Sequence, residues 1–161
     1  MHNERSDHEG RVIVGVDDHK GGVVTLRCAA EEARRRHAVL VAVTVWSPYG
    51  GEAAERALPC PELDAAQKAS AQAMLDAACE GAGLTDLLPV RRRVERGLLG
   101  PVLARLAHGP QDLLVIGLRH LRAFASLRPS PDRYCLRNAA APLLIVPPDW
   151  APGAPGPAAA A

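Results

Sequence analysis

Aromatic residues are scarce in this chain of 161 residues: Phe, Trp and Tyr make up 3% of it, although 48% of its residues are hydrophobic. The core must therefore be built mainly from Val, Leu, Ile and Ala, which suits a sheet covered by helices. Lysine is nearly absent as well, because Lys20 and Lys68 are the only lysines among 19 basic residues. The formal net charge of +1 gives no global attraction to nucleic acid or to a membrane surface. At this length we expect one domain with a sizeable core.

The sequence also lacks closely spaced cysteines and long apolar runs. Its four cysteines form no C-x-x-C pair, which indicates neither a zinc site nor a redox motif. We expect buried free thiols, with Cys60 the most exposed because it lies in a Pro-rich stretch. No apolar run approaches the roughly 20 residues that span a bilayer, and residues 1–10 lack the apolar centre of a signal peptide. The expected location is therefore the cytoplasm.

Catalytic motifs are missing too. Lys20 follows Gly15 without the glycine and hydroxyl that a G-x4-G-K-[ST] phosphate loop requires. There is no G-x-S-x-G nucleophile turn and no His pair at metal spacing. We therefore expect that the chain is not an enzyme.

Five short apolar runs alternate with helical stretches, at residues 12–16, 39–46, 90–94, 113–117 and 143–146. Four of them are almost continuously apolar, as in parallel strands that are buried on both faces. The run at 90–94 carries three consecutive arginines, which indicates an edge strand. Strands alternating with helices imply right-handed crossovers and an α/β fold with a doubly wound parallel sheet.

Four helices are expected between these strands. The first lies between residues 16 and 39, and the second begins near Asp64, where Gln67 completes a capping box. The third is short and begins near Pro101, and the fourth runs from Ser130 towards Asn138.

Three segments do not fit regular structure. Residues 47–63 contain Gly50, Gly51 and three prolines, which predicts a long mobile loop. Residues 1–10 are expected to be flexible, and the Pro/Ala-rich tail at 148–161 is expected to be disordered.

In an open doubly wound sheet, ligands bind at the carboxyl ends of the strands, where the strand order reverses. Asp17 follows the first strand, where it either caps the first helix or contacts a ligand. Gly117 ends the fourth strand and is followed by an arginine-rich stretch in which Asp132 is the only acid. Those arginines are either a solvated surface or a site for phosphate or an acidic partner.

At these positions the chain resembles the universal stress protein family. The resemblance rests on the first strand with Asp17, the helix after it, the second and fourth strands, and the last strand with Pro142, and it covers residues 11–147. It implies a five-stranded sheet of order 3-2-1-4-5 with helices on both faces. The first and fourth strands then lie side by side, which places the switch point between them.

Many members of that family bind ATP, and the resemblance implies a binding site. Asp17 matches the aspartate that contacts the nucleoside, and Val45 matches the second-strand position whose backbone contacts adenine. Gly117 matches the first glycine of a phosphate loop with the pattern G-x2-G-x9-G-[ST]. His120 stands at the second glycine, and Ser130 falls at one of the last two positions.

The rest of the loop departs from that pattern. Without a gap, Ser130 and Pro131 occupy the last two positions, and with one deletion Pro129 and Ser130 do, so neither alignment restores a glycine. Glycines in such a loop permit positive φ and let backbone N–H groups approach phosphate oxygens. His120 adds a side chain and each proline removes one N–H donor, so part of the amide cradle is lost.

Two interpretations of the loop follow. Ser130, Pro131 and Asp132 read as N-cap, N1 and N2 of a helix, and Asp132 would then occupy the electropositive end that a phosphate needs. Alternatively, Arg119 and its neighbouring arginines, together with His120, bind phosphate through side-chain hydrogen bonds.

The first interpretation predicts a binding or regulatory module of the stress response with weak or absent ATP binding. The second predicts a stress protein that binds ATP or AMP with arginines in place of glycines, with or without slow ATP hydrolysis. The resemblance also implies a homodimer through Leu143–Val146, since an unpaired apolar edge strand needs cover. A protein partner is possible, and nucleic-acid binding is a more distant alternative that strong salt dependence would reveal.

Overall fold

The computed structural model describes residues 10–17, 21–84, 88–118 and 130–152. Its centre is one sheet of five strands in the order β3-β2-β1-β4-β5, and all four strand pairings are parallel. The strands are β1 (Arg11–Gly15), β2 (Val39–Trp46), β3 (Val90–Arg96), β4 (Leu113–Gly117) and β5 (Leu143–Val146). The predicted strand order is confirmed, and so is the edge position of the arginine-rich strand.

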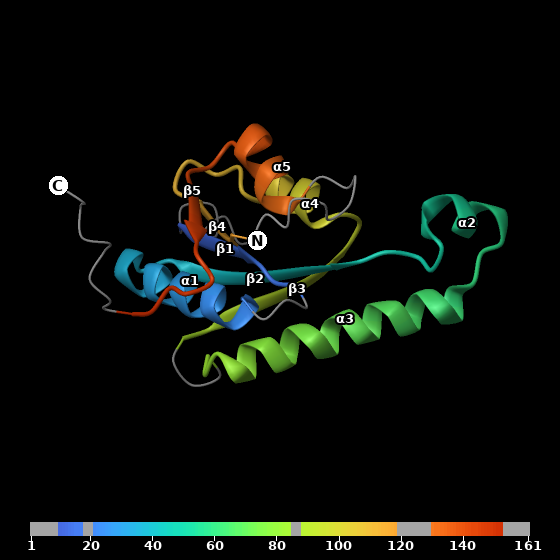
Figure 1. Ribbon diagram of the computed structural model, residues 1–161, viewed down its shortest axis with the longest axis horizontal. Helices are drawn as coiled ribbons and strands as arrows, with labels where there is room; N and C mark the ends of the chain where they lie inside the picture. The colour runs from blue at the N-terminus through green and yellow to red at the C-terminus, as the bar shows by residue number, and fades with distance from the viewer. Residues whose placement is uncertain (1–9, 18–20, 85–87, 119–129, 153–161) are drawn as a thin grey trace, which may run out of the picture.

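Helices cover both faces of the sheet, as Figure 1 shows. Helices α1 (Gly22–Arg36) and α3 (Pro61–Gly81) pack on one face, and α4 (Leu99–Leu106) and α5 (Pro131–Asn138) pack on the other. Helix α2 (Gly51–Ala57) stands away from the sheet and has no buried residue. Among the described helices none is long and apolar enough to cross a membrane.

Two hydrophobic cores lie on either side of the sheet. Along β1, Val12 and Val14 face the α1 and α3 side, while Ile13 faces the α4 and α5 side. The buried residues of both cores are Val, Leu, Ala and Cys, and the second core also contains Ile, as the shortage of aromatic residues requires. Trp150, which falls within the tail predicted to be disordered, packs partly buried against the first core.

The prediction of a mobile loop over residues 47–63 is wrong for most of that stretch. It contains the whole of α2 and the start of α3. Gly50 and Gly51 make the turn into α2, with φ of 78° and 85°, values that favour glycine. Helix α2 escaped detection because it has no buried face and therefore no apolar periodicity.

The capping box expected at Asp64 and Gln67 is also wrong, because α3 begins three residues earlier. Pro61 occupies its first position, where the fixed φ of proline favours a helix and the missing N–H is not needed. Cys60 is the N-cap and is exposed, while the other three cysteines are buried, as expected.

A partly buried ion pair joins the start of β1 to the turn before β4. Both carboxylate oxygens of Asp112 accept hydrogen bonds from Arg11, at 3.0 Å from Nε and 2.6 Å from Nη2. The backbone N–H groups of Gly109 and His108 also donate to Asp112, at 2.7 and 3.2 Å. Burial alone would raise the pKa of Asp112, but these hydrogen bonds outweigh it and lower the pKa below its usual value.

Candidate functional site

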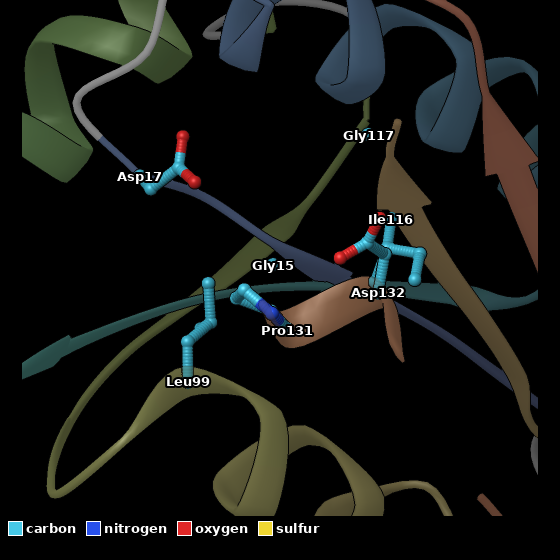
Figure 2. Close-up of a pocket in the computed structure, with 7 residues that line it drawn as sticks. All are labelled: Gly15, Asp17, Leu99, Ile116, Gly117, Pro131 and Asp132. Atoms are coloured by element: carbon cyan, nitrogen blue, oxygen red, sulfur yellow. The ribbon is translucent and has the colours of Figure 1, made fainter. Parts of the chain in front are cut away.

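A cleft opens where the strand order reverses, between the carboxyl ends of β1 and β4 (Figure 2). The cleft is small: the space between its walls and the open solvent above them is about 260 Å³, and the centre of a water-sized group can occupy only about 20 Å³ of it. Its lining comes from the end of β1, the end of β4 and the first residues of α4 and α5, and consists of Gly15, Asp17, Leu99, Ile116, Gly117, Pro131 and Asp132. The structure thus brings Asp17 and Gly117 together, as the switch-point argument predicted.

Asp17 does not cap the first helix. Helix α1 begins at Gly22, and its N-cap is Gly21, which has no side chain to offer. Asp17 instead lies two residues beyond the end of β1, partly exposed on the wall of the cleft. It therefore belongs to the lining of the cleft and not to the start of α1.

Gly117 has a packing reason to be glycine. A Cβ placed on it would lie 2.6 Å from Oγ1 of Thr25, closer than real Cβ atoms approach a neighbour. Thr25 is 3% exposed, and its hydroxyl donates a hydrogen bond of 2.9 Å to the carbonyl of Gly21. The fourth strand and α1 therefore require a glycine here whether or not a phosphate ever binds.

Asp132 is the unusual residue of the cleft. It occupies the second position of α5, and only 6% of its surface is exposed. Its Oδ1 atom is buried and has no hydrogen-bond partner. Figure 2 shows its carboxylate pointing from α5 into the cleft, on the opposite side from Asp17. A buried charge without a partner is unfavourable, and the electropositive helix terminus offsets only part of that cost.

The rest of α5 begins as the sequence predicted. Ser130 is the N-cap with extended backbone (φ −66°, ψ 148°), and Pro131 follows at the first position. The Ser130 side chain makes no capping hydrogen bond, so the cap is a matter of backbone conformation. Burial, with a smaller contribution from the charge of Asp132, raises the pKa of the Cys135 thiol to about 11.

The remaining predicted site residues are not part of the cleft as described. Val45 lies in β2, partly exposed and opposite Glu95 of β3, and it does not line the cleft. Arg119 and His120 lie outside the described residues. Leu99 was missed, because nothing in its sequence context distinguishes it from any apolar residue that begins a helix.

No metal centre is visible in the part of the chain that the structure describes. No group of three or more His, Cys, Asp or Glu side chains there could hold a metal ion. The chemistry of the described cleft is that of two carboxylates on walls otherwise made of glycine and apolar residues.

Comparison with known proteins places this geometry in a family. The chain is similar in structure to the universal stress protein UspA from Lactobacillus plantarum, with a TM-score of 0.65, 21% identity, and coverage of 85% of this chain and 97% of that one. It is similar to a universal stress protein solved in complex with cAMP (TM-score 0.59, 21% identity, 85% and 95% coverage). It is also similar to the universal stress protein from Archaeoglobus fulgidus in complex with dAMP (TM-score 0.56, 22% identity, 84% and 96% coverage).

These similarities establish the fold, and no curated protein matches the chain. The sequence profile described as the Universal stress protein family matches residues 9–147, which is most of the chain. That range begins just before β1, ends just after β5 and so contains the whole sheet. The chain belongs to the universal stress protein family.

Proposed function

We propose that this protein is a binding and regulatory module of the stress response in which ATP binding is weak or absent, and that it acts through protein contacts rather than catalysis. The observation that carries the proposal is the buried carboxylate of Asp132 at the second position of α5. A phosphate at the end of β4 would need the electropositive N-terminus of this helix. Asp132 already occupies that terminus with a negative charge.

The size of the effect supports weak binding. Two like charges about 4 Å apart repel by about 4 kcal/mol at an effective dielectric constant of about 20. That energy corresponds to roughly a thousandfold loss of affinity, since each 1.4 kcal/mol is a factor of ten. Gly117 is not evidence for phosphate binding, because any Cβ at this position would clash with Thr25, which already explains why the residue is glycine.

The second candidate is a stress protein that binds ATP or AMP through arginines. Two similar structures are complexes with cAMP and dAMP, which favours a nucleotide ligand. In that case Asp17 contacts the nucleoside, and Arg119 and His120 hold the phosphate in place of glycine amides. Nucleotides with one phosphate would then suit the site better than ATP, because fewer charges meet Asp132.

Isothermal titration with ATP and Mg²⁺ separates the two candidates. For the wild-type protein we expect no saturable heat up to millimolar ATP, and measurable binding once the charge is removed in Asp132→Asn. Glu62→Gln is the matched control, since Glu62 follows the first proline of α3 as Asp132 follows that of α5, but is exposed. Micromolar binding by the wild-type protein that Arg119→Ala abolishes would refute the proposal and establish the alternative.

We further propose that the protein forms a homodimer through β5. Among the described strands β5 is at the sheet edge and pairs with β4 alone, and Leu143, Leu144 and Ile145 are partly exposed. Pairing with a second copy would cover these apolar residues and the free backbone groups of the edge. Sedimentation equilibrium should give twice the mass of one chain, and Ile145→Asp should shift it to a folded monomer. A monomeric wild-type protein would refute the dimer.

A further inference from the structure

The outer face of α5 carries two positive charges that no described acid neutralises. Arg133 and Arg137 lie one helical turn apart, so they share a face of the helix, and both are exposed. Leu136 lies beside them and is 61% exposed. Arg133 is also the third residue of α5, where the electropositive end of the helix disfavours a cation. Like charges at this spacing repel each other as well, so the stability of α5 gives no reason for Arg133.

Six exposed arginines on α1, β3 and α4 have acidic partners. Their ion pairs with Glu or Asp side chains involve Arg35, Arg36, Arg92, Arg93, Arg96 and Arg105. Neither Arg133 nor Arg137 forms an ion pair with a residue that the structure describes. Asp132 is the only acid between Asp112 and Asp149, and it is 6% exposed with its carboxylate pointing into the cleft. It therefore does not neutralise the outer face of α5.

A ligand for this face needs negative charge beside an apolar group. The planar guanidinium groups of Arg133 and Arg137 match carboxylates in geometry, and each can donate two parallel hydrogen bonds. Leu136 offers apolar surface next to them. We propose that the outer face of α5 binds an acidic segment of a partner protein, with carboxylates on the two arginines and an apolar side chain on Leu136.

The composition of the face favours a protein segment over a nucleic acid. A nucleic acid binds mainly through its phosphates, and the net charge of +1 gives it no long-range attraction to this chain. Single strands also stack their bases on aromatic rings, whereas the exposed apolar residue of this face is Leu136. An aliphatic side chain of a peptide packs on leucine without needing such a ring.

This inference rests on the proposed function, because it names the chemistry of the partner through which the protein would act. It concerns a different surface, since neither Arg133 nor Arg137 lines the cleft. Binding of ATP and binding of an acidic peptide are therefore measured at separate places, and the two proposals can fail separately.

The test uses the full chain labelled with ¹⁵N and follows its amide signals during titration with the peptide acetyl-Glu-Glu-Leu-Glu-Glu-amide. We expect saturable shifts centred on α5 that weaken as NaCl is added. Arg133→Gln combined with Arg137→Gln should raise the Kd by about fivefold or more. Arg34→Gln combined with Arg91→Gln is the matched control and should leave the Kd unchanged. It removes the same charge from two exposed arginines on α1 and β3 that form no ion pair with a described residue.

The peptide acetyl-Gln-Gln-Leu-Gln-Gln-amide, which has the same leucine without the charges, should give no saturation. This comparison on the wild-type protein decides even if a variant does not fold. Three results would each overturn the inference: equal binding of the two peptides, equal loss in the α5 variant and its control, or tighter binding of a single strand of thymidines than of the acidic peptide. No binding of the acidic peptide together with no binding of ATP would refute this inference and leave weak or absent ATP binding standing. Micromolar binding of ATP would refute the proposed function, and the peptide titration would still decide this inference.

Discussion

Replacing Gly117 by alanine tests whether this glycine is kept for packing or for phosphate. The added Cβ would lie 2.6 Å from Oγ1 of Thr25, which is 0.8 Å inside the 3.4 Å at which ordinary contact begins. Thr25 cannot turn away freely, because it is buried and its hydroxyl is bonded to the carbonyl of Gly21. Gly117 does not have a positive φ, so alanine adds no backbone strain there. The clash with Thr25 alone therefore sets the change in stability.

Adding a methyl group to a packed interior costs typically 1–3 kcal/mol, and the short contact suggests about 2 kcal/mol here. For a domain of this size, about 2 kcal/mol lowers Tm by roughly 4–8 °C. Differential scanning calorimetry of Gly117→Ala should show this loss. Gly81→Ala is the control, because its Cβ would lie 3.6 Å from Val23 and alanine favours the helix, so Tm should stay or rise slightly.

A double-mutant cycle isolates the contact. Thr25→Ala removes Oγ1 and destabilises the protein by itself, but in that background Gly117→Ala should cost close to nothing. The expected coupling is about 2 kcal/mol. If Gly117→Ala leaves Tm within 1 °C of wild type, or costs the same with and without Thr25, the packing explanation for Gly117 is refuted.

Three further predictions concern stability and thiol chemistry. Asp112→Asn should cost about 2–3 kcal/mol at pH 7 in urea unfolding, because it breaks a largely buried pair with Arg11. Folding lowers the pKa of Asp112 from its usual value of 3.8, so this advantage of the wild-type protein should be complete above about pH 5. It should be lost as pH falls below 3.8 and through the lowered pKa of the folded state, and a pH-independent difference would contradict the reasoning. In the native protein one thiol, Cys60, should react rapidly with a disulfide reagent, and Cys60→Ser should abolish that reaction; fast labelling of a second thiol would contradict the burial of the others. Gly100→Ala should destabilise by about 1–3 kcal/mol, because its Cβ would lie 2.8 Å from Cβ of Tyr134 across the α4–α5 contact, and an unchanged Tm would show that these helices can separate.

The sheet was predictable from sequence because each strand carries its own signal. A parallel strand that is buried on both faces reads as a continuous apolar run, as β4 does, and three arginines mark β3 as the edge. The helices were less uniform. The start of α5 was predictable from Ser130 and Pro131, which occupy its N-cap and first positions. Helix α2 has no buried residue, so its sequence shows no apolar periodicity that would predict a helix.

The site was predictable only in part, because a cleft depends on which segments meet. The switch-point argument placed Asp17 and Gly117 together, since both end adjacent strands. Helix capping rules gave Asp132 its position on α5 but not its burial, because that depends on the packing of α5 against the sheet. Leu99 had no signal at all, since an apolar residue at the start of a helix is common in any fold.

Gly117 and Asp132 show why a motif position has to be weighed against its packing. A glycine at the first position of a phosphate loop suggests a nucleotide, yet the contact with Thr25 requires glycine for a reason that any protein with this α1–β4 packing shares. A carboxylate at a helix N-terminus is ordinary when exposed, as at Glu62, because water satisfies it. The same group at Asp132 is buried with an oxygen unbonded, a state that capping alone does not explain. The ligand chemistry of this cleft is therefore better inferred from Asp132 than from the glycine that aligns with the family's motif.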